Sequence, residues 1–325
     1  LRLAERYRPT LVLVGRTPQE REDPATAAIH DDRALKQAIM ERQRQAGGTV
    51  TPVTVENEFR RLTAQREVEE NLNRLRQAGS RVEYLSCDVR AAAAFRALID
   101  GVYARHGRID GVIHGAGIIE DKLIQDKQLA SFQRVVSTKA HSAFTLAAAL
   151  RPETLRFLTF FSSVSGRFGN RGQADYAAAS EVLNKLAQEL DRRWPAHVTS
   201  INWGPWLTTG MASEGVQRQF AERGVELIPL SVGCQRLVEE LRFGRKGEVE
   251  VVVGGSRQPL GDDGAHDAIT LPGTVGSAPE LRADARPALP LLSIQSELSA
   301  LPGGGVEVVR VFDPQHDLYL SDHRI

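Results

Sequence analysis

The chain contains few cysteines, and the positions of these cysteines argue against a disulfide framework or a metal centre. Only Cys87 and Cys234 occur among 325 residues, the first in a predicted strand and the second in a predicted helix. Single buried cysteines usually act as small apolar side chains. The eight histidines show no zinc-like spacing either. We therefore predict no disulfide and no bound metal, and expect a reducing compartment, the cytoplasm.

An excess of charge and a long apolar run are also absent. The 41 Lys and Arg residues balance 41 Asp and Glu residues, so there is no electrostatic footprint for nucleic acid or an anionic membrane. No uninterrupted apolar run is long enough to span a bilayer. The charged start, LRLAERYRPT, is not followed by the apolar core of a signal peptide. The sequence thus predicts neither a nucleic-acid-binding nor a membrane-spanning protein.

The chain does contain a regular alternation of apolar strand candidates and amphipathic helical stretches. The strand candidates are 11–15, 82–87, 111–114, 155–162, 198–203 and 248–253, and the clearest helical stretches are 91–105, 131–150 and 175–193. This alternation predicts an α/β fold, a Rossmann-like doubly wound parallel sheet with helices on both faces. Ligands bind such sheets beyond the carboxyl ends of the strands, where Asp88, Gly115 and Ser163 fall.

Composition further divides the chain into parts. The predicted parts are an α/β domain over 1–255, a flexible linker rich in Gly, Pro and Ala over 256–289, and a short β fragment over 290–325. Residues 17–80 exceed what a strand–helix–strand unit needs and contain two charged, helix-patterned runs, 32–45 and 62–77. We predict a helical insertion there, which could be a surface decoration or a contact with a neighbouring domain.

Three polar residues carry the strongest chemical signal. Ser163 follows an apolar strand candidate, Tyr176 lies at the start of the Ala-rich helix that comes next, and Lys139 lies on the preceding amphipathic stretch. A lysine ammonium beside a tyrosine should lower the tyrosine pKa, so that the hydroxyl can donate a proton near neutral pH. A serine hydroxyl could hold a carbonyl oxygen. Singly, they could be a core tyrosine, a capping serine and a solvated lysine. Together they predict reduction of a ketone.

These residues, with the segments SSVSGRFGNRGQADYAAASEVLNK, INWGPW and ERGVELIPL, resemble the ketoreductase domains of modular polyketide and fatty acid synthases. That group is a branch of the short-chain dehydrogenase/reductase superfamily, and the match is closest to the polyunsaturated fatty acid and enediyne-type synthases. The branch takes its lysine from the earlier helix, where Lys139 stands, and has Asn where this chain has Ser180. The resemblance implies NADPH-dependent reduction of a β-ketoacyl thioester on an acyl carrier protein, with Tyr176, Ser163, Lys139 and Ser180 as the catalytic residues.

The same resemblance implies a nicotinamide cofactor site. Arg16 ends the first strand candidate, where a guanidinium can pair with the 2′-phosphate of NADPH, although it could be an ordinary surface arginine. Asp88 and Val89 would meet the adenine, and Asp88 could also cap the next helix. The remaining cofactor residues implied are His114, Gly115, Ala116, Gly117, Gly204, Pro205 and Trp206.

Substrate residues also follow from the resemblance. Those implied are Glu120, Asp121, Phe168 and Met211. Ketoreductases that form D-hydroxyls usually carry Leu-Asp-Asp after the cofactor loop, where this chain has Ile119-Glu120-Asp121, and the opposite class has Trp where this chain has Phe168. Residues 211–224 match a mobile lid over the substrate. The resemblance thus implies a D-β-hydroxyacyl product, although Glu120 and Asp121 could be solvated loop acids.

Both ends of the chain carry further expectations. Residues 303–325 resemble the opening strands of a synthase dehydratase, a hot-dog fold, with His323 at its catalytic histidine. Related reductases begin with a strand and a Gly-rich turn that binds pyrophosphate, which residues 1–10 do not supply. We therefore expect a piece of a multi-domain synthase, inactive in isolation, whose partners are an acyl carrier protein and neighbouring domains including a dehydratase. The alternatives are an inactive pseudo-ketoreductase that braces its neighbours, which Ser180 favours, and a free-standing sugar or steroid reductase.

Overall fold

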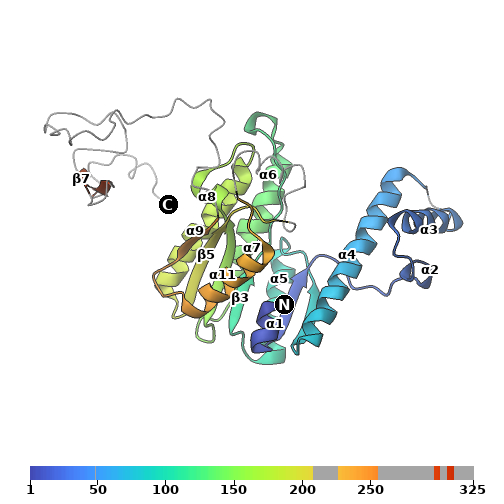
Figure 1. The fold of residues 1–325 in the computed structure, drawn as a ribbon, viewed down its shortest axis with the longest axis horizontal. Helices are drawn as coiled ribbons and strands as arrows, with labels where there is room; N and C mark the ends of the chain where they lie inside the picture. Colours follow the sequence, from blue (N-terminus) through green and yellow to red (C-terminus); the bar gives the residue numbers. More distant parts are fainter. Residues whose placement is uncertain (48, 208–225, 255–295, 301–305, 311–325) are drawn as a thin grey trace. The chain divides into compact units, whose positions relative to one another are not determined.

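The computed structural model describes residues 1–47, 49–207 and 226–254, and the backbone of 296–300 and 306–310. The chain divides into two units, Leu1–Ala265 and His266–Ile325 (Figure 1). The lid predicted over 211–224, the linker predicted over 256–289, and His323 lie outside the described residues. The domain boundaries inferred from composition stay predictions.

The first unit contains parallel sheets, as the strand–helix alternation predicts. The strands are β1 (Thr10–Gly15), β2 (Arg81–Ser86), β3 (Gly111–His114), β4 (Phe157–Ser163), β5 (His197–Trp203) and β6 (Glu250–Val253). β1 pairs only with β2, whereas β3, β4, β5 and β6 form a second sheet in that order. The predicted parallel α/β fold is thus confirmed, and within the described residues no strand joins β1 to β3.

The core of this unit lies against β4 and β5, whose side chains are mostly buried. Three helices supply the rest of the core: α5 (Ala92–His106), α7 (Ser142–Ala149) and α9 (Ala174–Arg193). Members of this core include Phe95, Ile99, Leu146, Leu158, Phe160, Leu183 and Val198. By contrast, Val14 of β1 and Ile113 of β3 are exposed. β1 and β3, which each have one edge without a strand partner in the described residues, are thus less buried than β4 and β5.

The insertion is helical, as predicted, and it has its own small core. It consists of α2 (Pro24–Ala27), α3 (Asp32–Gln45) and α4 (Pro52–Gln77), where Leu35, Ile39 and Leu62 are buried together. The bounds of α3 match the prediction, whereas α4 begins at Pro52 rather than at residue 62. Thr51 and Thr54 form a capping box, and Pro52 between them is the first residue of the helix; both are strong signals of a helix start. Figure 1 shows α2, α3 and the first half of α4 standing apart from the sheets.

Several shorter elements complete the fold. They are α1 (Arg2–Tyr7), the 3₁₀ turn η1 (Ile124–Asp126), α6 (Leu129–Val136), the π-helical turn η2 (Ser137–His141), α8 (Val164–Phe168) and α11 (Leu230–Phe243). In the second unit β7 (Ser296–Ala300) and β8 (Val306–Arg310) form an antiparallel pair, which by itself does not test the predicted hot-dog fold. None of the described helices is long and apolar enough to cross a membrane.

Candidate active site

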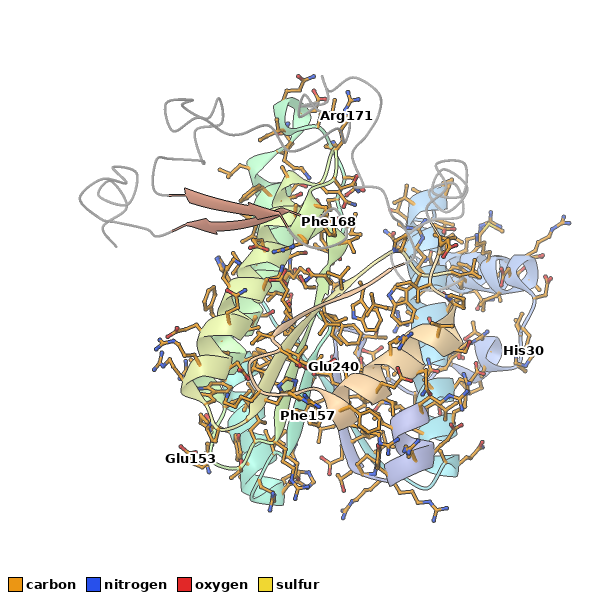
Figure 2. All side chains as sticks on the ribbon, turned by 60° about the vertical axis from the view of Figure 1, so that its left-hand side comes forward. His30, Glu153, Phe157, Phe168, Arg171 and Glu240 are labelled. Carbon is orange, nitrogen blue, oxygen red and sulfur yellow. The ribbon has the colours of Figure 1, made fainter. Side chains whose placement is uncertain are left out.

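The predicted catalytic serine and tyrosine meet at the carboxyl end of β4. Ser163 is the last residue of the strand and Tyr176 lies in the first turn of α9. Ser163 Oγ accepts a hydrogen bond from Ser165 N at 3.1 Å and caps α8, so the capping role considered for this serine is real. Its hydroxyl is also close enough to Tyr176 to contribute to lowering the pKa of that tyrosine. In Figure 2 the labelled Phe168, at the end of α8, lies toward this end of the sheet, opposite Phe157 at the start of β4.

Lys139 reaches the same place from a π-helical turn. The helix predicted over 131–150 is interrupted by η2, within which Lys139 is buried. Such turns often occur at functional sites, since the extra residue re-aims a side chain. Lys139 Nζ donates a hydrogen bond to Phe161 O at 2.9 Å and lies 3.5 Å from Tyr176 OH. It also lies 4.5 Å from the centre of the Tyr176 ring. The structure therefore brings together all three residues of the predicted cluster.

The electrostatics of this cluster differ from the expectation that the lysine lowers the tyrosine pKa. Burial raises the pKa of Tyr176 to about 12, against a smaller lowering by the Ser163 side chain. Burial also lowers the pKa of Lys139 to about 7. The expectation of a lowered tyrosine pKa is thus wrong for this structure, because the dry site penalises the phenolate and the ammonium alike.

Ser180 lies one turn after Tyr176 on α9 and is fully buried. Its hydroxyl has no hydrogen-bond partner among the described residues, while its carbonyl accepts a bond from Ser162 Oγ at 3.0 Å. A Cβ on Gly166 would lie 2.8 Å from Ser180 Cβ. The absence of a side chain at Gly166 thus lets α8 pack closely on α9, and the role of Ser180 in catalysis stays a prediction.

His114, at the end of β3, braces the π-helical turn. Its Nε2 lies 2.8 Å from Ser142 Oγ, and Ser142 in turn donates to Thr138 O at 2.6 Å. Nε2 is therefore the protonated ring nitrogen, because the serine hydrogen is already used. Burial, with a smaller effect of Lys139, lowers the pKa of His114 to about 4. His114 is thus neutral and positions the turn that carries Lys139.

The residues predicted to hold the adenine end of the cofactor lie at the ends of β1 and β2. Arg16 is exposed beyond β1, close enough to Asp88 to contribute to lowering its pKa. The main cause is Arg90, which donates to the Asp88 carboxylate at 2.5–3.0 Å and holds its pKa at about 2. Asp88 does not cap α5, since Ala91 occupies that position; the alternative of a helix cap is wrong. Val89 packs against the main core.

The residues predicted on the nicotinamide side include three glycines and Trp206, whose ring is tilted against that of Trp203. A Cβ on Gly115 would meet only Phe161, at 3.9 Å, so the backbone there is open to a ligand, and Ala116 and Gly117 follow in the same loop. Gly204 is tightly packed, with Val253 O 3.3 Å from the position of a Cβ. After Pro205, the Trp206 ring lies 4.8 Å from that of Trp203. The open backbone at Gly115 leaves room for a nicotinamide cofactor.

The loop after β3 carries the residues implied in stereocontrol. The Glu120 carboxylate accepts hydrogen bonds from Arg134 at 2.6 and 2.8 Å, which hold its pKa at about 2. Asp121 accepts a bond from Gln173 Nε2 at 2.9 Å. Both acids thus have side-chain partners although Asp121 is exposed, and their role in stereocontrol stays a prediction. Phe168 is 52% exposed and touches neither acid in any described contact, and Met211 lies outside the described residues.

Sequence reasoning missed the polar residues around this loop. Lys127, Gln173 and Asp175 are all largely buried in side-chain contacts near Tyr176. Gln173 and Asp175 stand directly before the tyrosine in GQADY, and polar residues opening an Ala-rich helix are a usable signal. Nothing in the sequence links Lys127 to them, because the contact depends on how the loop folds back on α9. The described residues hold no group of three or more potential metal ligands.

Comparison with known proteins identifies the family. The family model described as the KR domain matches residues 2–208. The chain belongs to the KR, or ketoreductase, domain family. It is 32% identical over 267 residues to a polyunsaturated fatty acid synthase of Thraustochytrium sp., covering 80% of this chain and 9% of the relative. It is 37% identical over 142 residues to a polyketide synthase of Streptomyces halstedii, covering 44% and 2%. KR domains of such synthases are oxidoreductases.

Solved structures agree with this placement. A ketoreductase domain from the bacillaene assembly line matches with a TM-score of 0.55 at 27% identity, covering 80% of this chain and 53% of that one. A ketoreductase from the first module of phoslactomycin biosynthesis in Streptomyces sp. HK803 matches with a TM-score of 0.53 at 30% identity, covering 57% and 43%. The parallel sheets with flanking helices are therefore those of a ketoreductase fold. The chain spans only a small part of the synthases that it matches.

Proposed function

We propose that this domain reduces a β-ketoacyl thioester, carried by an acyl carrier protein, to a β-hydroxyacyl thioester with NADPH, as part of a multi-domain synthase. The observation that carries the proposal is the buried cluster of Lys139, Ser163 and Tyr176 at the carboxyl end of β4. The polyketide and fatty acid synthases that the chain resembles supply the substrate class. The dehydratase-like tail and an enediyne-type origin remain part of the proposal.

The cluster suits protonation of a ketone oxygen. Tyr176 keeps its proton at neutral pH, since burial raises its pKa, and so would act as the acid that protonates the oxygen while Ser163 holds it. Lys139, whose pKa is about 7, could then return a proton to the tyrosine, because a group that titrates near the working pH exchanges protons most effectively. A bound nicotinamide would supply the hydride that adds to the carbonyl carbon.

The cofactor preference rests on Arg16. It is exposed at the end of β1, where a guanidinium could form charge-assisted bonds to the 2′-phosphate that only NADPH carries. Asp88, next to it, already has Arg90 as its partner, so Arg16 is not needed to neutralise that carboxylate. Because Arg90 pairs with Asp88, the Arg16 guanidinium could bind the 2′-phosphate, which supports NADPH over NADH.

The rival function, an inactive structural ketoreductase, rests on Ser180. Its buried hydroxyl has no partner in the described part of the chain and does not reproduce the reach of the Asn that the resemblance leads one to expect there. The intact geometry of Lys139 and Tyr176 opposes this rival, because a buried lysine is costly to keep without a use. We therefore favour the active enzyme.

The test is Tyr176→Phe in the full synthase. We expect ketoreduction to fall by about 10²–10⁴-fold, the usual contribution of a general acid, with NADPH affinity retained. Tyr103→Phe is the matched control: Tyr103 is equally buried, but its hydroxyl only accepts a bond from Arg151 N. Near-normal turnover of Tyr176→Phe would refute the assignment, and an unmodified synthase that reduces no β-ketoacyl thioester would favour the structural rival.

A further inference from the structure

A buried ion pair fastens the loop after β3 to the helix that carries Tyr176. Lys127 Nζ lies 2.8 Å from Asp175 Oδ2, and the two side chains are 5% and 1% exposed. A pair this dry gains little stability over apolar residues, because both charges lose their water. Its position relative to Tyr176 offers a more specific role.

The pair links two backbone positions that matter for the proposed reaction. The same ammonium of Lys127 donates a hydrogen bond to the carbonyl oxygen of Glu120 at 2.5 Å. On the other side, Asp175 Oδ1 accepts a bond from the backbone N–H of Tyr176 at 2.9 Å. One carboxylate and one ammonium therefore connect the loop at Glu120 to the first turn of α9 at Tyr176.

Two further contacts fasten the same loop to the residues just before Tyr176. Gln173 donates to the Asp121 carboxylate at 2.9 Å and accepts from Ser165 Oγ at 2.8 Å. The backbone N–H of Lys122 donates to Gly172 O at 3.0 Å. The loop and the start of α9 thus form one hydrogen-bonded unit, and the ion pair is its buried part.

We propose that Lys127 and Asp175 are positioning residues that fix the loop at 119–122 against Tyr176 and so determine which face of the ketone meets the hydride. The proposal rests on the proposed reductase function. The physical reason is that a ketone whose oxygen is hydrogen-bonded can still bind in two orientations, which exchange the places of its two substituents. The two orientations present opposite faces of the carbonyl carbon to the hydride. The loop beside the tyrosine restricts that approach, and its contacts with Lys127, Gly172 and Gln173 hold it next to the start of α9.

The test compares variants that break the pair with one that removes both charges. In the full synthase, Lys127→Met and Asp175→Asn should each lower the ratio of the two β-hydroxyacyl enantiomers by about tenfold and raise KM for the acyl substrate, since small misplacements near a reacting centre have large effects. NADPH affinity should not change. Lys127→Arg keeps the charge and should restore most of the selectivity. Lys185→Met, which breaks an exposed pair on the same helix, is the matched control.

A double variant keeps the proposal testable if the single variants fold poorly. Lys127→Met with Asp175→Asn leaves no unpaired buried charge and keeps an acceptor for the Tyr176 N–H. It should fold and still show the lower enantiomer ratio, with faster amide hydrogen exchange over residues 119–127. A double variant with normal selectivity, in a synthase that reduces its substrate, would overturn the positioning role alone. Absence of reduction by the unmodified synthase would instead overturn the proposed function.

Discussion

Lys139 Nζ lies 3.5 Å from the hydroxyl of Tyr176 while the lysine side chain is almost entirely removed from water. The pKa of this lysine falls to about 7 because burial penalises the ammonium, and no other cause contributes to the shift. Between about pH 7 and 10.5 the unfolded chain therefore binds a proton that the folded chain does not. The contribution of Lys139 to the free energy of unfolding should therefore rise as the pH rises from about 7 to 10.5.

This relationship predicts how Lys139→Met changes the pH dependence of stability. Below about pH 7 the unmodified protein carries the full cost of a buried charge in its folded state. The free energy of unfolding of Lys139→Met should therefore exceed that of the unmodified protein by the largest amount there. The gain should shrink as pH rises from 7 to 10.5. Denaturant titrations of both proteins at several pH values measure it, with Lys185→Met, on the surface of α9, as the control. Parallel stability curves for the native protein and the variant would contradict the lowered pKa.

Much of the fold could be predicted from local pattern, whereas the site electrostatics could not. The strand at 111–114 and the helix at 32–45 were predicted with the bounds observed, because periodicity and caps are local signals. The break at Ser137–His141 was not, since a π-helical turn depends on what Lys139 reaches in three dimensions. The raised Tyr176 pKa was missed for a similar reason: burial depends on packing that the order of residues does not reveal.

The close contact of α11 with Trp206 gives a prediction about stability. A Cβ on Gly233 would lie 2.3–3.0 Å from the Trp206 ring, so Gly233→Ala should overpack the contact and cost about 1–3 kcal/mol. Gly101, inside α5, is the matched control, because its added Cβ would approach only the flexible end of Arg105. Gly101→Ala should stabilise by about 0.5–1 kcal/mol. Equal effects of the two substitutions in denaturant titrations would show that Trp206 does not need the glycine.

Arg16 gives a prediction about cofactor choice. Arg16→Ala in the full synthase should weaken NADPH binding by more than tenfold, roughly the value of a lost charge-assisted contact, and leave NADH binding nearly unchanged. Arg108→Ala is the control, since Arg108 is an exposed arginine paired with Asp110 before β3. Binding titrations with both cofactors decide the matter. Equal weakening of NADPH and NADH would give Arg16 a structural role instead.

The product of the full enzyme should be the D-β-hydroxyacyl thioester. The resemblance associates acids in the loop after the cofactor segment with D-hydroxyls, and here Glu120 and Asp121 are both held in place, by Arg134 and Gln173. Phe168, half exposed at the end of α8, stands where the opposite class carries Trp. Chiral chromatography of the released acid measures the outcome.

Glu120→Gln should reduce the excess of D product, since it weakens the bidentate contact to Arg134 that orders the loop. Glu189→Gln, in an exposed pair on α9, should leave that excess unchanged. A predominantly L product from the unmodified enzyme would show that this loop does not direct substrate entry in the way that the resemblance implies.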